Sequence, residues 1–151
     1  MLSSAIEPPQ AAEDCQDFEA LRGPQDCYRL WSSHWWSSDR DRHVLLIGLY
    51  PEVPLKAPTS SERRLAERLG CTGIIKVNVC DLRAADLDAI RDAGIVACSG
   101  LNRSSIVELA GDAAAVVVCW DAVPEPLSGF VERVLSDLRA VGIKPIYPLH
   151  G

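Results

Sequence analysis

Four apolar runs alternate with segments that carry helix start and stop signals, and this alternation constrains the fold of the chain more than any other feature. The runs read VLLIGLY, GIIKVNVC, AAVVVCW and KPIYPLH. They largely lack polar alternation, as expected of strands that are buried on both faces. We therefore predict parallel core strands near residues 44–49, 74–79, 115–120 and 145–149.

The segments between these runs have the signals of amphipathic helices. SSERRLAERLG ends at Gly70, AADLDAIRDAG at Gly94 and EPLSGFVERVLSDLRAVG at Gly142, while NRSSIVELAGDA is expected to start at an Asn102 cap. Strands that alternate with helices favour an α/β fold. We predict three layers: a mainly parallel sheet of about four core strands, with helices on both faces.

The length of 151 residues fits one domain, and we place it at residues 25–151. Residues 1–24 are rich in Pro, Gln, Glu and Ala without periodicity, which predicts a flexible or peripheral arm. The aromatic segment CYRLWSSHWWSS, residues 27–38, is expected to form an irregular or edge strand. In an extended chain Trp35 and Trp36 point to opposite faces.

Composition excludes several classes of protein. The net charge of −6 disfavours tight DNA binding, although the arginines leave a local basic patch open. Six cysteines without a C-x-x-C pair, no signal peptide and no membrane-length apolar run favour a reduced, cytoplasmic protein without a membrane partner. Three histidines far apart, without ligands at metal spacing, predict no metal site, and we expect no cofactor.

In an open α/β sheet, ligands bind at the carboxyl ends of the strands. We therefore expect any ligand in a crevice bordered by four loops. The alternative is that the Pro-rich loop plugs this edge of the sheet. The four loops are Tyr50–Thr59, Cys80–Arg83, Gly100–Arg103 and Trp120–Pro126.

A series of short motifs over residues 27–150 resembles a bacterial and phage family catalogued as domain of unknown function 1643. The motifs stand, in the order of that family, at Tyr28–Trp31, Leu49–Glu52, Pro58–Thr59, Val77–Val79 with Arg83–Ala84, Gly100–Asn102 and Cys119–Asp121. The polar positions depart from the family pattern. Tyr50-Pro51-Glu52 stands where members have Asn-Pro-Ser, and Asp121 stands where they have Gly.

More distantly, the layout is similar to the uracil-DNA glycosylase superfamily, with GLYP after the first core strand and LHG after the last. This resemblance implies a glycosylase-like crevice for a flipped base. It implies catalytic roles for Glu52, which would orient water, and His150, which would donate to the departing base. It implies ligand-binding roles for a further set of side chains: Tyr50, Asn78, Arg83, Asn102 and Trp120.

Each of these residues also has a purely structural interpretation. Glu52 would simply face solvent, Asn78 would bond a neighbouring loop, and Arg83 would pair with a nearby carboxylate. We expect a nucleobase or nucleotide binder with little or no glycosylase activity; any catalysis would be that of a glycosylase-like hydrolase. The alternative is a non-catalytic module that binds a protein through its acidic surface and its Trp-rich segment, Trp31, Trp35 and Trp36.

Overall fold

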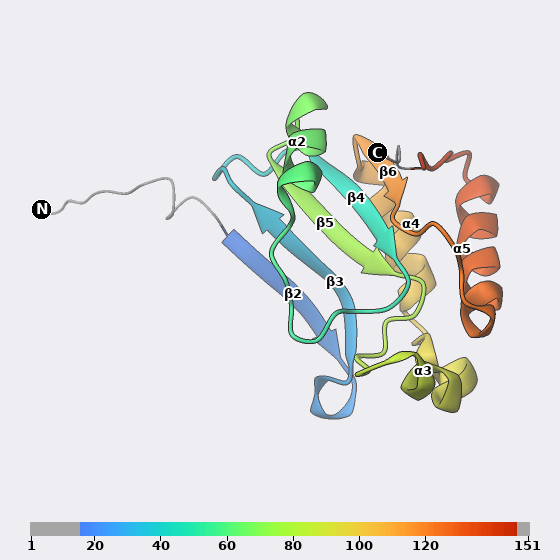
Figure 1. Ribbon diagram of the computed structural model, residues 1–151. Helices are drawn as coiled ribbons and strands as arrows, with labels where there is room; N and C mark the ends of the chain where they lie inside the picture. Colours follow the sequence, from blue (N-terminus) through green and yellow to red (C-terminus); the bar gives the residue numbers. More distant parts are fainter. Residues whose placement is uncertain (1–15, 148–151) are drawn as a thin grey trace, which may run out of the picture.

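The computed structural model describes residues 16–147 and has an α/β fold built on one open, mixed sheet (Figure 1). Its five described strands lie in the order β2-β3-β5-β4-β6. The two pairings that involve β3 are antiparallel, whereas β4 pairs in parallel with both β5 and β6. The sheet is therefore only partly parallel. The strands span Gln16–Arg22 (β2), Tyr28–Trp35 (β3), His43–Gly48 (β4), Gly73–Asn78 (β5) and Ala115–Val118 (β6).

Three of the predicted core strands are present within a few residues of their expected bounds. β4 is buried at each position from His43 to Ile47, as its unbroken apolar sequence predicts for a strand at the centre of the sheet. At the fourth predicted strand, Ile146 forms a single parallel bridge with Val117. The remainder of that run, from residue 148, lies outside the described residues.

The Trp-rich segment is predicted to be an irregular or edge strand; β3 is not at the edge, although its register with β2 shifts between Ala20 and Leu21. It pairs with β2 on one side and with β5 on the other. The edge strand is β2, so part of the predicted N-terminal arm is a peripheral strand of the sheet rather than a flexible segment. Its sequence, QDFEALR, has no apolar run, because an edge strand needs little burial. The search for apolar runs therefore did not identify it as a strand.

Four α-helices within the described residues complete the fold. They span Ser60–Arg68 (α2), Leu87–Ala93 (α3), Asn102–Asp112 (α4) and Ser128–Ala140 (α5). Thr59 and Glu62 form a capping box at the start of α2, and Asp86 caps α3. The predicted Asn102 cap is wrong: α4 has no side-chain cap, and Asn102 is its first helical residue.

The sheet lies between two groups of helices. On one face, α2 packs over a small core that includes Ala66, Ile74 and Val117. On the other face, α3, α4 and α5 pack over the larger core (Figure 1). Trp35 belongs to the larger core and Trp36 packs on the smaller one, as expected for neighbours in a strand.

Candidate functional site

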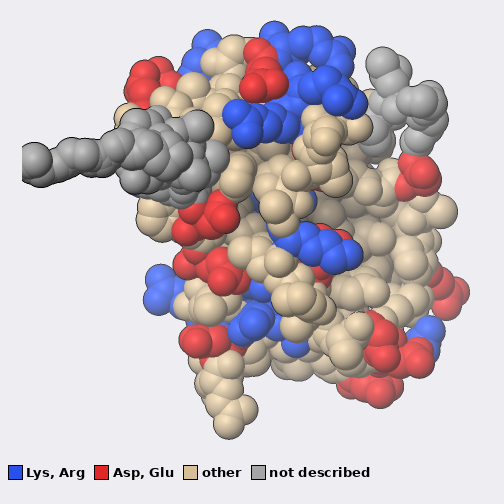
Figure 2. All heavy atoms as spheres, turned by 60° about the vertical axis from the view of Figure 1, so that its left-hand side comes forward, with Lys and Arg blue, Asp and Glu red and all other residues tan. Residues whose placement is uncertain are grey.

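The face of the sheet that carries α2 holds a pocket of about 300 Å³, which we call the strap pocket. Its roof is the segment of residues 50–59, called here the strap, which leaves the end of β4, crosses in front of β3 and β2 and returns to α2 (Figure 1). Figure 2 shows this side of the molecule hollowed near its middle, with basic and acidic side chains around the hollow. The strap pocket is lined by Arg29, Ser32, Leu46, Gly48, Leu49, Tyr50, Glu52, Leu55, Lys56, Glu62, Lys76, Val77, Asn78 and Cys119.

A buried arginine fastens the strap to the sheet. Arg29, on β3, is only 4% exposed; its Nη1 donates to the Glu52 carbonyl oxygen at 2.8 Å. Its Nε donates to the Glu19 carboxylate on β2 at 2.7 Å. Because a buried guanidinium is costly without partners, these two contacts hold the first part of the strap against β2 and β3.

Polar side chains from two neighbouring strands form the floor of the strap pocket. Ser32 on β3 is the cross-strand partner of Lys76 on β5, and Asn78 lies two residues further along β5 on the same face. Lys76 Nζ lies 3.2 Å from the Glu62 carboxylate of α2. Within residues 16–147, neither the Ser32 hydroxyl nor the Asn78 carboxamide has a hydrogen-bond partner. The floor therefore offers polar groups that are free to bind a ligand.

The Asn78 side chain owes its place to a glycine on the neighbouring strand. A Cβ atom on Gly48, its partner in the register, would stand 2.6 Å from Asn78 Oδ1. Only a residue without a side chain at this position leaves room for the carboxamide.

The ionic groups of the strap pocket are paired with one another. Glu52 and Lys56 form an exposed pair within the strap, with 3.4 Å between Oε2 and Nζ. Glu52 could act as a general base only if neighbouring residues buried its carboxylate, but its side chain is 54% exposed. Desolvation, and to a smaller extent the Glu62 carboxylate, raise the pKa of the Cys119 thiol to about 11. That thiol is consequently protonated near neutral pH and is a poor nucleophile.

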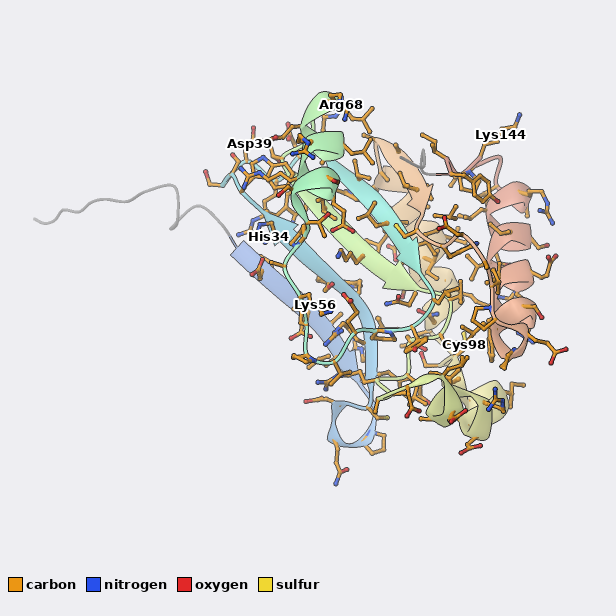
Figure 3. The ribbon with its side chains drawn as sticks, in the orientation of Figure 1. His34, Asp39, Lys56, Arg68, Cys98 and Lys144 are labelled. Atoms are coloured by element: carbon orange, nitrogen blue, oxygen red, sulfur yellow. The ribbon has the colours of Figure 1, made fainter. Side chains whose placement is uncertain are left out.

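A smaller hollow of about 80 Å³, called here the side pocket, adjoins the strap pocket and shares four lining residues with it: Ser32, Leu55, Lys56 and Lys76. It also contains His34 of β3, whose Nδ1 is hydrogen-bonded to the Asp17 carboxylate of β2. Figure 3 shows His34 beside β2 and β3, and Lys56 on the strap that crosses them. The side pocket thus extends the site toward the edge of the sheet.

Three of the candidate residues named from the sequence, Tyr50, Glu52 and Asn78, line the strap pocket. Trp120 does not line it and packs instead against the larger core. His150 lies outside the described residues.

The other two candidates, Arg83 and Asn102, serve the structure around the end of β5. Arg83 Nη1 donates to the Asp26 carbonyl oxygen at 2.9 Å, and its buried Nε has no partner within the described residues. Asn102 is fully buried, and its Nδ2 donates to the Asn78 carbonyl oxygen at 2.8 Å. It also contacts the sulfur of Cys98, which Figure 3 shows near α3 and apart from the strap.

The same region contains a buried carboxylate that the sequence did not single out. Asp81 is fully buried and accepts hydrogen bonds from the backbone N–H and the hydroxyl of Ser99. Burial raises the pKa of Asp81, whereas the Ser99 bonds lower it. These bonds tie the loop after β5 to the turn before α4, so Asp81 has a structural role.

The strap pocket also differs from the expected crevice. Of the four loops named from the sequence, only Tyr50–Thr59 contributes to its lining. The other walls come from the faces of β3, β4 and β5, because the strap turns back over the sheet instead of extending beyond its edge. The loop is a cover over part of the sheet rather than a plug in the edge.

Sequence reasoning missed the floor and the anchor of the pocket. Lys76 is the one charged residue within β5, and Ser32 stands between tryptophans in β3. A polar residue inside an otherwise apolar strand is a signal for Lys76, as it is for Asn78, whereas β3 contains several polar residues and its sequence does not distinguish Ser32 from them. Arg29 had no such signal, since its role depends on β2.

Comparisons of the chain with protein-family models, with curated proteins and with solved structures find no match in any of the three. The resemblances noted above therefore rest on short motifs alone. Across residues 16–147, no three His, Cys, Asp or Glu side chains are grouped so that they could hold a metal ion. No helix in that part of the chain is long and apolar enough to cross a membrane.

Proposed function

We propose that the strap pocket binds a small, polar, planar molecule of nucleobase type and does not catalyse base excision. The observation that carries the proposal is the Asn78 carboxamide, which lies on the pocket floor without a partner among the described residues. A primary carboxamide presents donors and an acceptor in one plane, which complements the amide edge of a heterocyclic base. A ligand edge that pairs with both the donors and the acceptor of this side chain is therefore favoured.

The rest of the lining supports the same class of ligand. Apolar surface around the polar floor comes from Leu46, which belongs to the smaller core, and from Leu55 of the strap, which is 38% exposed. Tyr50 also lines the pocket, and it packs against the larger core as well. Small-molecule sites are typically concave and mostly apolar, with a few polar groups that fix orientation, and they start at roughly 300 Å³. The strap pocket is at the lower end of this range, which suits a ligand of one or two rings.

The state of Glu52 supports binding without excision. A general base for water needs a carboxylate that is held toward the substrate and shielded from solvent. The Glu52 carboxylate is exposed and pairs with Lys56, so it lacks both conditions.

A titration of the protein with uracil, cytosine, adenine and guanine, followed by backbone amide NMR, tests the proposal. We expect shift changes at Tyr50, Lys76 and Asn78 with at least one base, and we expect Asn78→Ala to weaken that binding about tenfold. Gln25→Gly is the matched control, because it removes an exposed carboxamide at a left-handed position (φ 56°) that glycine tolerates. No shift change at these residues with any base would refute the proposal.

Protein binding is a second candidate, and the observation in its favour lies away from the tryptophans. Trp35 is buried, and Trp31 and Trp36 pack against the two cores. In contrast, Ile95 and Val96, in the 3-10 helix η2 (Gly94–Ala97), are 78% and 57% exposed. If the chain binds a protein there, replacing both residues by Ser will abolish partner binding and leave base binding unchanged.

A further inference from the structure

The side pocket is placed to contact any ligand that the strap pocket holds. The two hollows share four lining residues, and the strap passes over both of them. The Ser32 hydroxyl belongs to both and has no partner within the described residues. A ligand whose planar part lies against Asn78 would therefore reach the side pocket with any substituent that points toward β2 and β3.

The imidazole of His34 is a polar group in the side pocket whose orientation is fixed by a hydrogen bond. The Asp17 carboxylate holds its Nδ1, and the His34 side chain is only 20% exposed. An imidazole oriented in this way presents its second nitrogen, Nε2, in a defined direction. Among residues 16–147 this nitrogen has no hydrogen-bond partner, so it is available to a hydroxyl group of a ligand.

The charges around both pockets decide against a phosphate group. Lys56 pairs with Glu52, and Lys76 pairs with Glu62. Arg29 pairs with Glu19, and the fourth candidate cation, His34, already faces a carboxylate. A phosphate would bring about −1.5 to −2 charges into a site whose positive groups are neutralised.

Two further features point the same way. The Glu62 amide at the start of α2 is occupied by the Thr59 hydroxyl in the capping box. The chain as a whole carries a net charge of −6, which repels anions.

We propose that the side pocket is the sugar subsite of the strap pocket and that the ligand is a neutral nucleoside, bound through hydrogen bonds from its sugar hydroxyls to His34 and Ser32. This inference rests on the proposed function, since it requires the base to lie in the strap pocket. It adds the sugar as a second recognised group, and it excludes the phosphate.

Calorimetric titrations with a base, its ribonucleoside and its 5′-monophosphate test this assignment for the four common bases. We expect at least one nucleoside to bind about tenfold more tightly than its free base, corresponding to one or two added hydrogen bonds. We expect the monophosphate to bind no more tightly than the nucleoside. His34→Ala should remove the advantage of the nucleoside and leave the affinity for the free base unchanged.

A second variant keeps the test valid if the loss of His34 disturbs the sheet. Ala57 is exposed on the strap and lines the side pocket but not the strap pocket, so Ala57→Phe should fill the side pocket from above. It should weaken the nucleoside about tenfold and leave the base unaffected. Asn78→Ala, in contrast, should weaken both.

The possible results separate the two proposals. Equal affinity for base and nucleoside, unchanged in both side-pocket variants, would overturn the sugar subsite and leave base binding intact. Tighter binding of the monophosphate than of the nucleoside would overturn the neutral-ligand assignment. Binding of neither base nor nucleoside would overturn the proposed function together with this inference.

Discussion

At the scale of single residues, Gly48 and Asn78 link the backbone of the sheet to the chemistry of the strap pocket. The carboxamide occupies the space that a side chain on Gly48 would take. The atom that a new Cβ would meet is the far end of the Asn78 side chain, which can rotate away. Fold and binding are therefore separable at this pair.

We predict that Gly48→Ala displaces the Asn78 carboxamide and weakens base binding about tenfold. The stability should change by no more than about 1 kcal/mol, because alanine also restricts the unfolded chain. Calorimetric affinity and urea unfolding of the same sample measure both effects. A loss of stability of several kcal/mol, or unchanged affinity, would contradict this interpretation of Gly48.

His43, at the start of β4, is a buried histidine outside the pocket. Its Nε2 lies 3.2 Å from the Leu109 carbonyl oxygen, and its ring makes a T-shaped contact with the ring of Trp35. Burial lowers the pKa of His43 from 6.5, while the Leu109 carbonyl and Asp112 oppose this effect. The folded chain consequently keeps the imidazole neutral at a pH where the unfolded chain protonates it.

This difference predicts a stability that depends on pH. The stabilising contribution of neutral His43 is complete above 6.5 and is lost as the pH falls from 6.5 toward the lowered pKa of the folded state. Urea unfolding at several pH values between about 5 and about 7.5 should show this fall in the wild type and not in His43→Phe. Asp81 is present in both proteins, so its contribution to the pH dependence cancels in the comparison. Parallel curves of unfolding free energy against pH would show that His43 contributes nothing.

At the scale of the elements, an aromatic ring on β3 packs directly against a glycine on β5. Trp35 pairs with Gly73 in the register, and a Cβ on Gly73 would overlap the Trp35 ring system. The ring is a rigid part of the larger core, so it cannot move aside as the Asn78 side chain can.

We predict that Gly73→Ala destabilises the fold by about 3 kcal/mol, at the upper end of the usual cost of overpacking. Gly111→Ala is the matched control. Apart from its chain neighbours and the backbone of its own helix, no atom lies within 4 Å of a Cβ built at that position in α4, so the change should stabilise the helix by up to about 1 kcal/mol. Thermal unfolding of both variants measures the contrast, and equal effects would show that the Trp35 contact is not limiting.

The elements also show what the sequence could and could not predict. The apolar runs located β4, β5 and β6 because strands buried on both faces have no polar alternation. They did not reveal β2, an exposed edge strand, and so the interior position of β3 was missed. The sequence grouped Tyr50, Glu52 and Asn78 with Arg83, Asn102 and Trp120, which do not line the strap pocket. It did not point to Arg29 or His34, because their partners lie on β2.

At the scale of the whole molecule, charge limits the partners of the site. The net charge of −6 opposes the approach of a nucleic-acid backbone, and the cations in the strap pocket are paired. A free base or nucleoside carries no such penalty. The net charge of the chain and the pairing of the cations in the strap pocket therefore both favour an uncharged ligand.

We predict no excision of uracil from single-stranded DNA, and at best weak, salt-sensitive binding of nucleic acid. A gel assay of abasic product formation with protein in excess over a uracil-containing oligonucleotide checks the first point. Fluorescence anisotropy at low and high salt checks the second. Measurable turnover that disappears in Glu52→Gln would show that the strap carries a catalytic carboxylate after all.

The strand order has a consequence for how the chain assembles as it is synthesised. β2 and β3 form a hairpin from neighbouring residues, but the next partner of β3 is β5, and β4 is made between them. The inner edge of the hairpin therefore stays open until residue 78 has left the ribosome, and β5 must then insert between β3 and β4. Such non-local pairing slows folding and leaves an unpaired edge exposed during synthesis. The order in which the strands are synthesised thus differs from their order in the sheet. The newly made β2–β3 hairpin is the segment that most needs protection from aggregation.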